Sequence, residues 1–143
     1  MDIERGKRYR DKLSLVEERH QDVGGWTSDV SAQEFDEDKK LHLATYKAFQ
    51  EMVEASMDVV AMLVRDSQLL VKDDYVNIDL LRERHLLSPK IADALKEGNG
   101  LRNRLIHRYN HLRSSMALSS MRRLLPMFAA FCQEVESWLK QRL

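Results

Sequence analysis

Residues 31–67 read SAQEFDEDKKLHLATYKAFQEMVEASMDVVAMLVRDS, and this stretch decides the fold. Small and apolar side chains recur along it every three or four residues, at Leu41, Ala44, Ala48, Met52, Ala55, Val59, Met62 and Leu63. A 3.6-residue period places them on one face of a helix. Ser31 and Glu34 form a capping box, whose side-chain oxygens satisfy amides that a first helical turn leaves unpaired. The stretch therefore predicts one long central helix from Ser31 to about residue 67.

Helical patterns flank this central helix. A helix is predicted over about residues 2–22, ended by Gly24 and Gly25, and a short helix before Leu87. Ser88 followed by Pro89 is a strong start signal, since Ser can cap and Pro lacks an amide that would be unpaired anyway.

The helix that starts there carries Gly-Asn-Gly at 98–100. Because glycine costs helix stability, we expect a break or bend at that point and continuation to about residue 111. A last helix is predicted from about residue 119 to the end of the sequence, with a kink at Pro126.

The composition agrees with an all-α fold. The 143 residues are 43% apolar and include only 5 Gly and 2 Pro, too hydrophobic for disorder and too poor in turn residues for an all-β sandwich. We predict one domain over residues 1–143, a helical bundle of four long helices and one short helix. No apolar run approaches the roughly 20 residues of a membrane span, and the charged N-terminus is unlike a secretory signal, so a cytoplasmic location is expected.

Charge is divided unevenly along the chain. Before Gly98 there are 15 Lys and Arg against 21 acids, and from Gly98 onward 8 against 2. Residues 98–133 carry no acid and contain Arg102, Arg104, Arg108, Arg113, Arg122 and Arg123. This segment is a candidate anion-binding surface, and an ordinary solvated face is the structural alternative.

Other chemical motifs are weak. Glu17-x-x-His20 has the spacing of a di-iron helix but stands alone, so neither a metal nor another cofactor is expected. The histidines at 20, 42, 85 and 111 are interpreted as surface or satisfied core residues. Cys132 falls on an apolar stripe and is predicted to be a buried packing residue.

The informative segment is 101–109, LRNRLIHRY. Arg102, four intervening residues, His107, one residue and Tyr109 resemble the Arg-x4-His-x-Tyr signature of the HepT toxins, which belong to the HEPN superfamily of helical ribonucleases. Asn103 also fits that signature. The segment 54–60 resembles the family's acidic, small-residue turn, and the order of helices resembles the family's over about residues 40–140.

The residue types suit phosphodiester cleavage without the family. Arginine is a permanent planar cation that matches phosphate oxygens, and histidine most readily both takes and gives a proton at neutral pH. On a regular helix Arg102 and His107 lie about 140° apart around the axis and roughly 7.5 Å apart along it, with Asn103 between them. One helix is therefore a poor closed site, and two facing copies would grip a phosphate better.

The resemblance implies such a homodimer, which cleaves RNA by attack of the 2′-hydroxyl without a metal. In this interpretation His107 transfers protons, Arg102 stabilises charge on the phosphate and Asn103 orients the groups. Arg104 and Arg108 are candidate substrate contacts. The resemblance also implies an MNT nucleotidyltransferase antitoxin as partner, which transfers AMP from ATP to Tyr109 and so blocks the cleft.

Alternatives stay open at this point. Asp58 either orients a motif residue or is a buried acid paired for structural reasons. The chain could be a non-catalytic HEPN protein that binds RNA or nucleotide or docks a nucleotidyltransferase. A helical DNA-binding regulator is the third hypothesis, although no helix-turn-helix with an exposed recognition helix stands out.

Overall fold

The computed structural model describes residues 1–107 and 113–143, and within these ranges the secondary structure is entirely helical. The helices are α1 (Ile3–Thr27), α2 (Ala32–Glu37), α3 (Lys39–Asp66), α4 (Asp74–Glu83), α5 (Pro89–His107) and α6 (Ser114–Lys140). The predicted all-α bundle with four long helices is confirmed. The described residues contain two short helices, α2 and α4, where the sequence predicted one.

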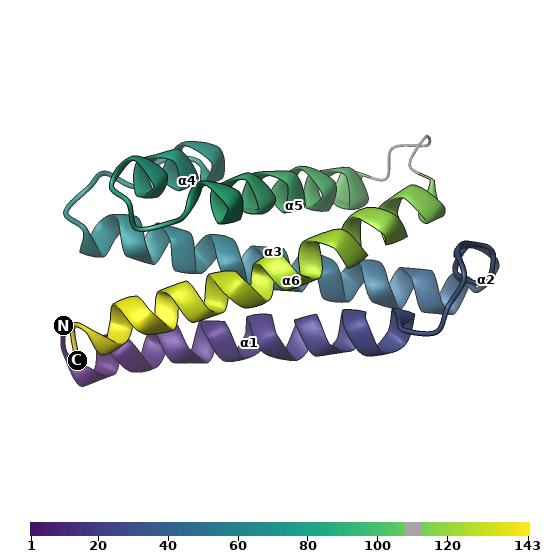
Figure 1. The fold of residues 1–143 in the computed structure, drawn as a ribbon, viewed down its shortest axis with the longest axis horizontal. Coiled ribbons are helices and arrows are strands. Elements are labelled where there is room, and N and C mark those ends of the chain that lie inside the picture. The colour runs from purple at the N-terminus through teal and green to yellow at the C-terminus, as the bar shows by residue number, and fades with distance from the viewer. Residues whose placement is uncertain (108–112) are drawn as a thin grey trace.

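The long helices pack side by side. Helix α1 lies along α3, and α4 and α5 pack on the opposite side of α3 (Figure 1). Helix α6 runs diagonally across the bundle, where it packs against α5, α2 and α1. Both termini lie at the same end of the molecule (Figure 1). Helix α5 is thereby held between α3, α4 and α6.

The long helix predicted from Ser31 is divided in two. The Ser31–Glu34 capping box is present as predicted, but it starts a helix of 6 residues. Asp38 has an extended backbone and both ends α2 and begins α3, where its side chain accepts a hydrogen bond from the Leu41 amide. The prediction of one helix was wrong because Asp38 is itself a favourable N-cap residue.

The glycines do not break helices in this protein. Helix α1 continues through Gly24 and Gly25 to Thr27, and α5 is continuous through the predicted bend at 98–100. All five glycines lie within the described residues 1–107, and none of them has a positive φ angle. At Gly98 the missing side chain serves packing instead, because the ring of Phe128 occupies the space where a Cβ atom would lie.

The later helix signals were more accurate. Helix α4 confirms the short helix before Leu87, and α5 begins at Pro89 as predicted. Helix α6 begins earlier than predicted, at Ser114, and contains Pro126 within its span. None of the described helices is long and apolar enough to cross a membrane.

The core lies where α1, α3 and α6 meet. Phe49 and Phe128 are fully buried and pack edge to face, with ring centroids 6.3 Å apart. Cys132 is buried as predicted, and burial raises the pKa of its thiol to about 12. Ion pairs at the edge of this core tie α1 to α3, between Arg5 and Asp66, Lys12 and Asp58, and Arg19 and Glu51.

Candidate functional site

Helix α5 presents the Arg, Asn and His of the motif. Leu101 and Leu105 are buried and fasten this part of the helix to the core. The spacing of 3.6 residues per turn then places Arg102 and Asn103 at the margin of the core and His107 in an exposed position. The structure therefore carries these three motif residues on one continuous helix.

Arg102 is the most enclosed of the three. Its side chain is 18% exposed, and carboxylates from two other helices flank its guanidinium. Glu54 of α3 places Oε1 3.7 Å from Nη1, and Asp74 of α4 places Oδ2 3.7 Å from Nη2. Nη2 donates a hydrogen bond to Oδ1 of Asn103 at 3.2 Å, whereas Nε is buried and has no hydrogen-bond partner within residues 1–107 and 113–143.

Asn103 links Arg102 to His107 along the helix. Asn103 and His107 are four residues apart and so are neighbours on the same face of α5. His107 lies one turn nearer the end of the helix as described and is exposed to solvent. Helix α5 thus carries a positioned cation, an amide and an exposed imidazole, with Arg102 about 140° around the axis from His107. These are groups that can bind a phosphate and move a proton.

Two predicted site residues, Arg108 and Tyr109, lie outside the described residues, so their predicted roles stay predictions. Arg104 is described and exposed on α5, two residues from Arg102. Its accessible cation is compatible with the predicted contact to a nucleic-acid backbone.

Two arginines of the basic segment, Arg122 and Arg123, contact other parts of the fold. Arg122 donates hydrogen bonds to the backbone carbonyls of Thr27 and Val30, and so fastens the connection between α1 and α2 to α6. Arg123 pairs with Glu97. Arginines of an acid-free segment thus find carboxylates and carbonyls on other parts of the chain.

Asp58 takes neither of its two predicted roles. It is exposed, with 56% of its side chain accessible, and pairs with Lys12 of α1 at 2.8 Å. The acids at Arg102 are Glu54 and Asp74, which sequence reasoning did not assign to the site. Glu54 lies in segment 54–60, which resembles the family's acidic turn. Its contact with Arg102, and that of Asp74, joins side chains from separate helices, and such contacts leave no regular spacing in a single sequence.

The lone Glu17-x-x-His20 motif has a structural explanation. Nε2 of His20 lies 2.7 Å from the backbone carbonyl oxygen of Leu125. Nδ1 of His42 similarly lies 3.1 Å from the carbonyl oxygen of Phe35. Within residues 1–107 and 113–143, no three His, Cys, Asp or Glu side chains are grouped so that they could hold a metal ion.

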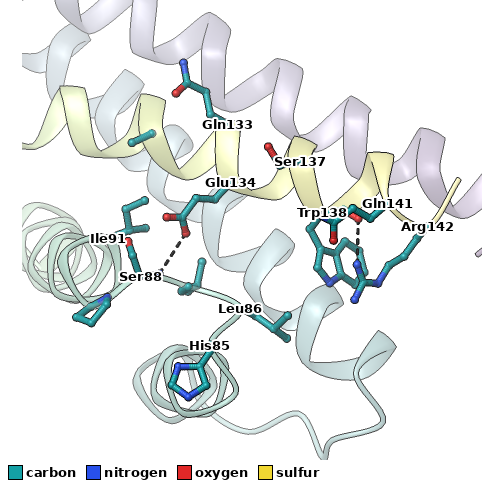
Figure 2. Close-up of a pocket in the computed structure, with 13 residues that line it drawn as sticks. His85, Leu86, Ser88, Ile91, Gln133, Glu134, Ser137, Trp138, Gln141 and Arg142 are labelled. Atoms are coloured by element: carbon teal, nitrogen blue, oxygen red, sulfur yellow. Dashed lines mark hydrogen bonds between the residues drawn. The ribbon is translucent and has the colours of Figure 1, made fainter.

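A hollow of about 670 Å³ lies far from the motif, between α6 and the connection from α4 to α5. Figure 2 shows Glu134 at its centre, where the carboxylate accepts a hydrogen bond from the Ser88 amide. Trp138 and Arg142 lie at the other end of the hollow, with the guanidinium 4.2 Å from the centroid of the indole ring. Pro89 lines the hollow at the start of α5, about 20 Å along the helix from Arg102.

Comparison with known proteins identifies the class. The fold matches the tri-AMPylated HEPN toxin of Shewanella oneidensis solved in complex with its MNT antitoxin, with a TM-score of 0.85 over 96% of this chain and 99% of that chain, at 22% identity. A cytosolic protein of unknown function, YutE from Bacillus subtilis, matches with a TM-score of 0.80 over 96% of this chain and 92% of that chain, at 15% identity. At these identities the likeness shows the fold, a HEPN-type helical bundle.

The sequence identifies the family. The family described as "Ribonuclease HepT-like" matches residues 15–135, and the chain belongs to this family. Two proteins of Archaeoglobus fulgidus named as candidate RNases are similar over much of their length. One is 37% identical over 108 residues, which are 76% of each chain. The other is 40% identical over 89 residues, 62% of this chain and 67% of that relative.

Proposed function

We propose that this protein is a metal-independent endoribonuclease and the toxin of a HEPN/MNT toxin-antitoxin pair. The observation that carries the proposal is the site on α5, where acids flank Arg102, and its buried Nε has no hydrogen-bond partner among the described residues. Asn103 lies beside Arg102 and one turn before the exposed His107. Membership of the HepT-like ribonuclease family supports RNA as the substrate.

The reaction follows from these side chains. The 2′-hydroxyl of RNA attacks the adjacent phosphorus, so the O2′–P bond forms and the P–O5′ bond breaks, which leaves a cyclic 2′,3′-phosphate and a 5′-hydroxyl. The imidazole of His107 takes the 2′-hydroxyl proton, and a protonated imidazole gives a proton to O5′. Arg102 stabilises the charge that develops on the phosphate oxygens, and Asn103 orients the reacting groups.

The working form of the enzyme is a homodimer. In this mechanism one imidazole takes a proton while another gives one, and two facing copies of α5 supply two His107 side chains to one cleft. Ile106 and Tyr75 support this arrangement, because each is a large apolar side chain, exposed to 43% and 39%, on a helix of the site. Sedimentation that shows monomer alone at working concentration contradicts the composite cleft.

Inhibition acts at Tyr109. An MNT nucleotidyltransferase joins the tyrosine oxygen to the phosphorus of AMP and releases pyrophosphate from ATP. The relative from Shewanella oneidensis is tri-AMPylated and bound to an MNT antitoxin, which supports this partner. A bulky anion two residues from His107 repels the RNA backbone and fills the cleft.

RNA cleavage in EDTA tests the activity. The unmodified wild-type protein is compared with His107→Ala, and the intact mass of both is checked for adenylyl groups. Cleavage by the wild type alone supports the proposal when circular dichroism shows the same helical content in both proteins. Equal cleavage by both proteins points to a contaminant, and no cleavage of several RNAs by unmodified wild type overturns the nuclease in favour of a docking subunit.

A further inference from the structure

We propose that Glu54 and Asp74 are positioning residues that hold the guanidinium of Arg102 ready for the scissile phosphate. The inference rests on the proposed nuclease function and adds two residues from α3 and α4 to a site otherwise built on α5. Each acid acts through Arg102 and requires no contact with RNA.

Burial makes a counter-charge necessary. The Arg102 side chain is 18% exposed, and an unpaired cation at that depth would turn toward water, because the desolvation of an isolated charge is costly. Glu54 stands near Nη1 and Asp74 near Nη2, so negative charge lies at both terminal nitrogens. Attraction to carboxylates from two helices therefore holds the guanidinium of Arg102 in position.

The distances leave the donors of Arg102 available. Charge-assisted N–H···O bonds measure about 2.7–2.9 Å, and both carboxylates lie at 3.7 Å. A guanidinium has five N–H donors. In the part of the chain that the structure describes, one of them donates to Asn103, and the buried Nε has no partner. The acids therefore compensate the charge of Arg102 without using up the hydrogen bonds that a phosphate needs.

The opposite effect of the acids, electrostatic repulsion of RNA from Arg102, agrees less well with the solvent exposure of the three side chains. The side chains of Glu54 and Asp74 are 48% and 36% exposed, so water and salt screen their field toward an incoming phosphate. The guanidinium is more buried than either acid, and its attraction to the acids is screened less.

The orientation of Arg102 is measurable without RNA. In ¹⁵N-labelled protein, the Nε–Hε signal that disappears in Arg102→Lys is assigned to Arg102. The order parameter of this N–H group is then measured in three proteins. They are the wild type, the single variant Glu54→Gln and the double variant Glu54→Gln/Asp74→Asn. We expect an order parameter near that of rigid backbone, about 0.85, in wild type and below about 0.6 in the double variant. Asp58→Asn is the matched control, since it also removes an acid of α3 but faces Lys12.

Kinetics of RNA cleavage then measure the consequence. Glu54→Gln should lower kcat about tenfold with less than a twofold change in KM, and Asp58→Asn should change neither. Glu54→Asp keeps the charge and should retain more kcat than Glu54→Gln. An Arg102 order parameter unchanged in both Gln-containing variants overturns the proposal, as does faster cleavage by Glu54→Gln. If wild type cleaves no RNA, the nuclease proposal fails while the order parameters still decide this one.

Discussion

A Cβ atom at Gly98 of α5 would lie 2.7 Å from Cζ of Phe128 of α6. Phe128 is fully buried, so a methyl group added at Gly98 would have to displace its ring within the core. The two helices approach each other as closely as a residue without a side chain allows. This contact lies one turn before Arg102 and sets the depth at which the motif sits.

Gly98→Ala should therefore destabilise the protein even though alanine favours helices. We expect the free energy of unfolding to fall by about 1–2 kcal/mol, since overpacking outweighs a propensity gain of about 1 kcal/mol. Gly25→Ala is the matched control, because Gly25 is also helical and nothing lies within 4 Å of its Cβ position. It should be stabilising in the same urea titration, and a stabilised Gly98→Ala would contradict the close contact.

Tyr9→Phe should cost stability through one hydrogen bond. The Tyr9 hydroxyl is buried and donates to Oδ2 of Asp66 at 2.6 Å, an oxygen that Arg5 Nε also contacts at 3.0 Å. Hydrogen bonds to charged groups contribute about 1.5–3 kcal/mol, so we expect a loss of about 2 kcal/mol. Tyr75→Phe, at a residue that is 39% exposed, should lose less than about 0.5 kcal/mol. Equal losses in chemical denaturation would assign no special role to the Asp66 contact.

Cys132 predicts a loss of stability at alkaline pH. Burial first, and then the negative charge of Glu17, raises the pKa of the folded thiol to about 12, against about 8.5 in an unfolded chain. Above pH 8.5 the unfolded state releases the thiol proton while the folded state keeps it, so stability falls as pH rises toward 12. Between pH 8 and 9.5 the wild type should lose about 1 kcal/mol more than Cys132→Ala. If the free energy of unfolding falls equally with pH in the two proteins, the pKa of the folded Cys132 thiol is not raised.

Arg104 should contribute to RNA binding through charge alone. Arg104 is exposed on α5 beside the motif, so Arg104→Ala should weaken RNA binding severalfold. The slope of log affinity against log salt concentration should become shallower by about one, since one phosphate contact is lost. Arg10→Ala removes an exposed cation that pairs with Glu136 between α1 and α6. It should leave RNA affinity unchanged in a fluorescence-anisotropy titration at several salt concentrations. An equal effect of both substitutions would mean that RNA contacts the whole surface rather than α5.

The fold was largely predictable because the apolar period survives in every long helix. The errors in helix boundaries came from residues that are compatible with two different local structures. Asp38 can lie inside a helix or cap the next one, and the observed backbone selects the cap. Gly98 was read as a breaker, whereas the protein uses it for the Phe128 contact that only tertiary structure reveals.

The residues of the candidate site that lie on α5 were predictable from the sequence, whereas those contributed by α3 and α4 were not. Arg102 and His107 are linked by spacing on one helix, which a sequence displays directly. Glu54 and Asp74 reach Arg102 from two other helices, and nothing in their own neighbourhoods marks them. The backbone turns that bring these helices together use left-handed residues that are not glycines, Gln68 with φ 66° and His85 with φ 60°.

The hollow beside Trp138 has a consequence for the search for inhibitors. A small molecule that fills it would raise the melting temperature by mass action and leave Arg102, some 20 Å along α5, open to RNA. A thermal shift alone therefore would not distinguish such a stabiliser from an inhibitor of the proposed nuclease. Cleavage of a reporter RNA, the reaction proposed for this site, makes that distinction.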